Sequence, residues 1–145
     1  MNTNIFNERQ RFTQIWVWIL IIGAALVITF TSKSMFTSIL MALMILLFYS
    51  MNLKTNISNE GITYRYIPFH FSNHLIKWAD IKEAYVREYK PMSEYGGWGL
   101  RYGRKGTAYN VKGNMGLQLI LKDGKKILIG TQKAEELEQF LQTVN

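Results

Sequence analysis

Two long apolar runs, residues 12–30 and 35–53, dominate the first third of the chain. Lys33, in the short link between them, is the only Lys, Arg, Asp, Glu or His from position 12 to position 53. A helix of about 19 residues spans roughly 28 Å, close to the thickness of the hydrocarbon core of a bilayer. Because a lone segment in lipid must pair its own backbone groups, both runs are expected to be helical. The pattern therefore predicts a transmembrane helical hairpin within residues 1–53.

The charges that flank the hairpin predict its orientation. Arg9 and Arg11 precede the first run and Lys54 follows the second, whereas the link carries Lys33 alone. By the positive-inside rule both termini are cytoplasmic, and the chain is predicted to be a multi-pass protein of the cell membrane. A cleaved signal peptide is the alternative for the first run, but no small-x-small cleavage site follows residue 30.

Three small residues, Gly23, Ala24 and Ala25, stand in the middle of the first run. Small residues let a neighbouring transmembrane helix approach closely, so these three are candidate packing positions. The alternative is that Gly23 has no packing role.

After residue 53 the pattern becomes that of short strands. Residues 62–66 alternate and follow a turn at 59–61, with residues 54–57 as the expected partner strand. Residues 74–78 and 107–111 are further predicted strands, whereas the apolar spacing of residues 81–89 leaves strand and helix both open. The clearest hairpin joins residues 116–121 to 125–130 across Asp123 and Gly124.

The chain ends in a predicted amphipathic helix over about residues 132–143. Thr131 is the expected N-cap, and the apolar positions that follow it have helical spacing: Leu137, Phe140, Leu141 and Val144. Such a stripe must pack on the sheet. The predicted fold class is therefore α+β: a transmembrane hairpin, then an antiparallel β-barrel or sandwich of about seven strands in residues 54–145, capped by this helix.

Four segments carry a resemblance to a known family: residues 61–65, 76–81, 94–99 and 129–132. Through them the chain resembles bacterial membrane proteins that combine two N-terminal transmembrane helices with a pleckstrin-homology-like (PH-like) cytoplasmic domain. The resemblance implies this fold for most of the chain, and it implies no particular activity.

The amino-acid composition excludes several kinds of functional site and indicates a basic surface. The chain has no cysteine, which excludes disulfides, thiolate zinc sites and cysteine nucleophiles, and its formal net charge is +7. Between positions 99 and 133 a single acid, Asp123, stands among eight basic residues: Arg101, Arg104, Lys105, Lys112, Lys122, Lys125, Lys126 and Lys133. Beside a bilayer such a field attracts anionic headgroups. The alternative is an ordinary solvated surface.

The glycine-rich segment 96–106 fails the tests for a phosphate-binding loop. A dinucleotide fingerprint would need a glycine at Tyr102, and no lysine follows Gly106 as a Walker loop requires. The segment is therefore either a structural hairpin loop or a contact surface. Trp98 either folds back onto the sheet or enters the headgroup layer. The candidate lipid or partner contacts are Trp98, Arg101, Arg104, Lys105 and Lys112.

We expect no catalytic, cofactor or metal site. His70 and His74 are four residues apart, but Pro68 argues against a helix there and no third ligand is near. A nucleic-acid partner is not expected for a membrane-tethered chain. The predicted function is a membrane-anchored, noncatalytic interaction module that binds lipid headgroups or a protein partner at the cytoplasmic face. The alternative is an accessory subunit of a larger membrane complex, assembled through the hairpin.

Overall fold

The structure is a computed structural model, and it describes residues 5–144. The chain divides into two compact units, one formed by Phe12–Met51 and the other by Met1–Arg11 together with Asn52–Asn145. We call them the helical unit and the β unit.

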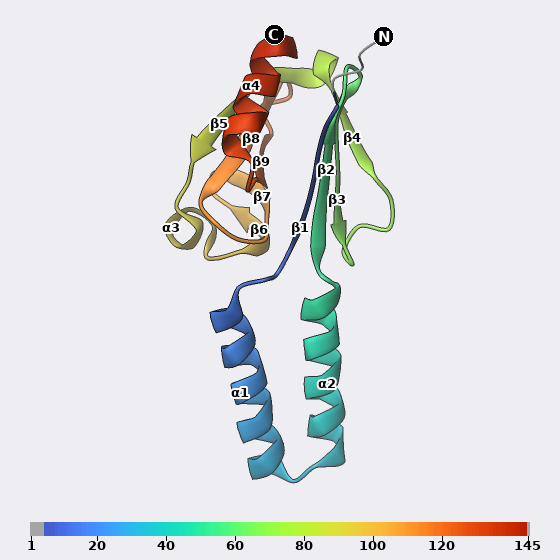
Figure 1. The fold of residues 1–145 in the computed structure, drawn as a ribbon, viewed down its shortest axis with the longest axis vertical. Coiled ribbons are helices and arrows are strands. Elements are labelled where there is room, and N and C mark those ends of the chain that lie inside the picture. The colour runs from blue at the N-terminus through green and yellow to red at the C-terminus, as the bar shows by residue number, and fades with distance from the viewer. Residues whose placement is uncertain (1–4, 145) are drawn as a thin grey trace. The chain divides into compact units, whose positions relative to one another are not determined.

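The helical unit contains two antiparallel helices, α1 (Ile15–Ser32) and α2 (Met35–Ser50), which contact each other (Figure 1). They lie close to the predicted ranges 12–30 and 35–53. Lys33 ends α1 in the left-handed conformation, and its backbone N–H donates to the Thr29 carbonyl (3.2 Å). By length and composition α1 is able to cross a membrane, whereas α2 is a shorter apolar helix of 16 residues. The transmembrane hairpin stays a prediction.

Most side chains of this unit are exposed. Ala25 is the buried residue of α1, whereas Gly23 and Ala24 are exposed. A Cβ placed on Gly23 would meet no atom within 4 Å. Of the three predicted packing positions, Ala25 alone is thus covered within this unit.

The first sheet of the β unit has the order β1-β2-β3-β4 and is antiparallel throughout. Its strands are β1 (Phe6–Arg11), β2 (Asn52–Ile57), β3 (Gly61–Ile67) and β4 (His74–Lys77). The predicted pairing of residues 54–57 with 62–66 is confirmed. β1 was not predicted: it precedes α1 in the chain, within the range 1–53 assigned to the hairpin, and it pairs with β2.

The second sheet has the order β5-β8-β9-β7-β6. Its strands are β5 (Ile81–Glu88), β6 (Gly99–Gly103), β7 (Gly106–Asn110), β8 (Met115–Leu121) and β9 (Lys126–Gly130). The predicted hairpin is confirmed as β8 and β9, and residues 81–89 resolve as strand. β7 and β9 run parallel, which departs from the all-antiparallel expectation.

The glycine-rich segment is more ordered than a single long loop. A short helix, α3 (Pro91–Tyr95), precedes it, and β6 lies inside it and pairs with β7 through a tight turn. Gly106 has φ +109 there, and a Cβ at this position would collide with the carbonyl of Lys126. Only glycine fits this turn without strain.

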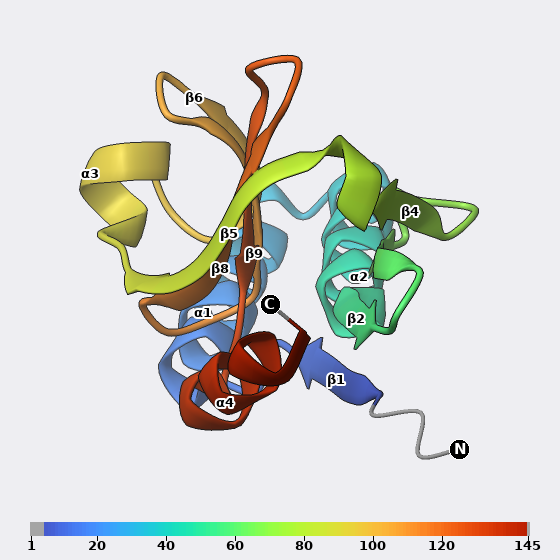
Figure 2. The same cartoon turned by 90° about the horizontal axis from the view of Figure 1, so that it is seen from above.

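The two sheets are open, so the described residues form a sandwich rather than a closed barrel (Figures 1 and 2). Fully buried side chains from both sheets fill the space between them, among them Leu53, Ile57 and Ile62 from the first sheet and Leu117, Leu119 and Ile129 from the second. The hydroxyl of Tyr66 on β3 donates to the carbonyl of Asn110, the last residue of β7 (3.1 Å). The opposite face of the second sheet is also covered, by a cluster of Tyr89, Tyr95, Ala108 and Leu128.

The C-terminal helix α4 (Ala134–Val144) packs beside β5, as its buried Leu137 and Leu141 predict. Both views place it near β1, where the rings of Phe6 and Phe140 are 6.4 Å apart. The Thr131 prediction needs correction because the helix begins later. The Thr131 hydroxyl accepts from the Lys133 N–H (3.0 Å) and donates to the Glu8 carboxylate (2.6 Å).

Candidate functional site

The predicted contact residues gather around β6. Trp98 precedes the strand, Arg101 lies in it, Arg104 and Lys105 form the turn to β7, and Lys112 follows β7. The Trp98 indole N–H donates to the Gly113 carbonyl (2.9 Å), so this side chain folds back onto a neighbouring loop. Arg101 in turn donates from Nε to the Trp98 carbonyl (3.0 Å).

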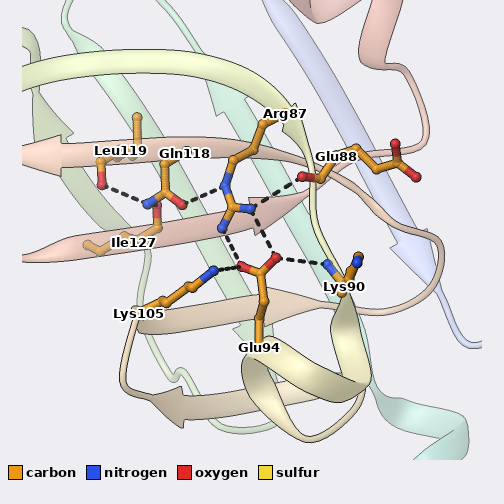
Figure 3. A network of polar contacts seen from close by, with 8 residues as sticks. All are labelled: Arg87, Glu88, Lys90, Glu94, Lys105, Gln118, Leu119 and Ile127. Carbon is orange, nitrogen blue, oxygen red and sulfur yellow. Dashed lines mark hydrogen bonds and ion pairs between the residues drawn. The ribbon is translucent and has the colours of Figure 1, made fainter.

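A half-buried carboxylate, that of Glu94, neutralises part of this surface (Figure 3). Glu94 on α3 accepts from the Arg87 guanidinium on β5, with an Nη2–Oε2 distance of 2.8 Å. Lys105 Nζ lies 3.5 Å from the same Glu94 oxygen. The Arg87 hydrogen bonds, aided by the Lys90 N–H and by Lys105, lower the pKa of Glu94 to about 2. Glu94 is therefore ionised in the folded protein, and Lys105 belongs partly to a structural network.

The network extends into the second sheet. Arg87 Nε donates to the side-chain oxygen of Gln118 (3.1 Å), and Gln118 donates onward to the carbonyls of Leu119 and Ile127 (3.3 Å each). The contacts drawn as dashed lines in Figure 3 thus help to fix α3 against β5 and β8. Arg101 and Arg104 remain exposed to solvent beside this network.

Sequence reasoning missed a second basic group, on the first sheet. The strand register places Arg9 opposite Lys54 and Lys54 opposite Arg65, so that three cations form one row across β1, β2 and β3. Arg9 and Lys54 entered the sequence argument only as flanking charges. The expected pairing of residues 54–57 with 62–66 already brings Lys54 and Arg65 together. Arg9 was missed because β1 was not expected to be a strand.

The two histidines come together in an aromatic cluster. Their ring centroids are 4.1 Å apart, and the His74 ring stacks on Tyr64 (5.6 Å). His70 Nδ1 accepts from the Tyr66 backbone N–H (3.2 Å), and burial lowers the pKa of His70. Within residues 5–144 no group of three or more potential metal ligands forms. His70 is half-buried in this aromatic cluster, whereas His74 is exposed.

Comparison with known proteins bears on the whole chain. The family model described as "Bacterial PH domain" matches residues 5–145. This range includes β1, the helical unit and both sheets of the β unit. The chain belongs to the bacterial PH domain family. No curated protein and no solved structure matches it. Domains of the PH type are generally noncatalytic interaction modules, and the PH-like resemblance stated from the sequence is confirmed at this level.

In this bacterial PH domain the helical pair lies between the first and second strands. β1 ends at Arg11 and α1 begins at Ile15, while α2 ends at Ser50 and β2 begins at Asn52. Because Arg11 and Asn52 are paired in the sheet, both chain segments leave the domain from adjacent strand ends. The basic row lies two residues inward from that edge.

Proposed function

We propose that this bacterial PH domain is a membrane-anchored, noncatalytic interaction module whose β unit binds an anionic lipid surface at the cytoplasmic face. The observation that carries the proposal is the insertion of two apolar helices between paired strands. A helix of 18 residues spans about 27 Å, and two links to adjacent strands would hold the β unit beside the bilayer.

Charge supports the choice of partner. The chain has a formal charge of +7, and exposed Arg101 and Arg104 lie in the same domain as the row of Arg9, Lys54 and Arg65. The cytoplasmic leaflet is negatively charged, and each nearby Lys or Arg contributes on the order of 1 kcal/mol to attraction. A tethered domain gains this attraction without further cost in translational freedom.

Anchoring and orientation can be tested by cysteine labelling, because the chain contains no cysteine of its own. Ser34→Cys lies in the link between the helices, and Lys122→Cys lies on the exposed β8–β9 turn. A membrane-impermeant maleimide should label Ser34→Cys in intact cells and Lys122→Cys only in inverted vesicles. Labelling of Lys122→Cys in intact cells would contradict the cytoplasmic location.

Lipid binding is tested with the full chain in nanodiscs. Amides of the β unit should exchange hydrogen more slowly when the disc contains phosphatidylglycerol than when it contains phosphatidylcholine alone. About 1 M salt should remove the difference, because it shortens the Debye length to roughly 3 Å. Equal exchange in both discs would reject the lipid proposal.

A second candidate function is that of an accessory subunit assembled through the helices. The observation that favours it is the open surface at Gly23, where a partner helix could approach closely. A protein that copurifies in mild detergent and is lost on Gly23→Leu, but not on Phe36→Leu, would support this function. Phe36 is 75% exposed on α2 and provides a matched site.

A further inference from the structure

The strongest unassigned feature of the β unit is the outer face of its first sheet. We propose that Arg9, Lys54 and Arg65 on this face form a binding site for the phosphate group of an anionic phospholipid. This inference rests on the proposed function and names both the site and the ligand class.

The row is set by strand register and not by sequence proximity. Arg9, Lys54 and Arg65 are direct partners across three neighbouring strands, which are spaced about 4.8 Å apart. The backbone positions of these three residues therefore lie within roughly 10 Å of each other, and their positive side chains project from the same face of the sheet. A phosphate group held above the central lysine would be within reach of both arginines.

No acid in the described part of the chain compensates this row. Glu8, the neighbour of Arg9, is buried and turned to the inner face, where it accepts from the Thr131 hydroxyl and from the Gln132 N–H (2.7 Å). Among residues 5–144 the ion pairs lie elsewhere. Like charges directly opposite each other destabilise a sheet. Repulsion within the row therefore lowers the stability of the folded state, and a bound anion would relieve it.

The row lines an open cavity of about 400 Å³. Glu8 also borders this cavity, but its carboxylate accepts hydrogen bonds from Thr131 and Gln132. Neutral hydrogen-bonding side chains border the cations there, namely Asn56, Thr63 and Asn73. Arg65 is held in direction by a hydrogen bond from its Nε to the His70 carbonyl (3.2 Å). A guanidinium offers paired N–H groups that suit the geometry of phosphate oxygens. Arginines, a lysine and amide donors together match a phosphodiester.

The loop beside the cavity favours a lipid over a soluble phosphate. Phe71, between β3 and β4, is 94% exposed, and Phe69 is 46% exposed. This loop follows Ile67, which pairs with Asn52, the first residue of β2 after α2. Aromatic side chains at such a position suit the interfacial layer of a bilayer, where ring and headgroup meet. An exposed phenylalanine would contribute nothing to binding a free phosphate.

The test uses the full chain in a nonionic detergent, titrated with short-chain phosphatidylglycerol, short-chain phosphatidylcholine and glycerol 3-phosphate. Bound ligand is counted by native mass spectrometry. We expect phosphatidylglycerol to bind most tightly. The double variant Lys54→Gln/Arg65→Gln should weaken it roughly 25-fold, or about fivefold for each neutralised residue. Lys122→Gln/Lys126→Gln removes the same charge from the β8–β9 hairpin and should leave binding within twofold.

Phe71→Ser separates the two sources of phosphate. It should weaken phosphatidylglycerol and leave glycerol 3-phosphate unchanged. Equal affinity of the unaltered chain for these two ligands would overturn the lipid assignment. If Arg101→Gln/Arg104→Gln abolishes lipid binding while Lys54→Gln/Arg65→Gln does not, this site is wrong although the proposed function stands. Cysteine labelling that places the β unit outside the cell would instead reject the proposed function itself.

Discussion

The two sheets of the β unit differ in whether their basic side chains have an acidic partner. On the second sheet Arg87 and Lys105 share the carboxylate of Glu94, which belongs to α3 and is half-buried. On the first sheet Arg9, Lys54 and Arg65 stand side by side with no acid among the described residues of that face. Basic side chains thus stabilise the packing of α3 on the second sheet, whereas on the first sheet they remain available to bind an anion.

This difference distinguishes basic residues that stabilise the folded state from basic residues that are free to bind a ligand. A partly buried ion pair that is also hydrogen-bonded stabilises the folded state, and losing one partner leaves the other uncompensated. An exposed row of like charges lowers stability slightly. Substitutions on the two sheets should therefore change stability in opposite directions.

The largest effect is expected for Glu94→Gln. A pKa of about 2 in place of 4.5 corresponds to about 3 kcal/mol of stabilisation of the folded state. Glu94→Gln should lose most of this at neutral pH, measured by thermal unfolding of the full chain in detergent. Glu88→Gln is the matched control, because Glu88 is exposed and its carboxylate accepts from the Asn114 side chain (2.7 Å) and not from Arg87. Equal losses in both variants would show that the network does not stabilise the fold.

The same carboxylate predicts a pH dependence. Since the folded-state pKa of Glu94 is lowered, its contribution is complete above about pH 4.5 and declines as the pH falls towards 2. Stability measured across this window should fall less steeply in Glu94→Gln than in the unaltered chain. Parallel curves for the two proteins would assign the acid sensitivity to other groups.

The same contrast between structural and exposed charges occurs within β1, at the neighbouring residues Glu8 and Arg9. Glu8 points inward to the Thr131 hydroxyl and the Gln132 N–H, whereas Arg9 points outward. Glu8→Ala should cost about 2 kcal/mol, because it leaves two donors without their acceptor. Arg9→Ala should change stability by less than about 0.5 kcal/mol. A large loss in Arg9→Ala would mean that the outer face is structural.

The strand β1 also shows why sequence reasoning found only part of the fold. The β8–β9 hairpin was predictable because apolar runs flank Asp123 and Gly124. In β1 two of the three inward positions are polar, Glu8 and Gln10, so no alternation of apolar and polar residues marks the strand. Gln10 is buried because its side-chain nitrogen donates to the Gly130 carbonyl (2.6 Å), a partner 120 positions away.

The candidate site was predictable to a similar extent. The excess of cations around β6 was visible in the sequence, but the carboxylate that neutralises Lys105 comes from α3, which was not predicted. The row of Arg9, Lys54 and Arg65 depends on the register of three strands. The pairing of β1 with β2 joins strands on either side of the helical unit, and a long-range pairing of this kind leaves no local pattern.

The smallest effect is expected for Lys54→Gln. Lys54 is the central cation of the row, so neutralising it relieves repulsion from Arg9 and Arg65 together. The folded state should gain about 0.2–1 kcal/mol in low salt, and the gain should shrink as salt screens the exposed charges. Lys122→Gln removes the same charge from an exposed turn outside the row and should leave stability unchanged. A variant that is more stable yet binds phosphatidylglycerol less tightly would show that Lys54 is kept for its ligand. A stability loss in Lys54→Gln would instead mean that the lysine supports the sheet, and the contrast between the two sheets would no longer hold.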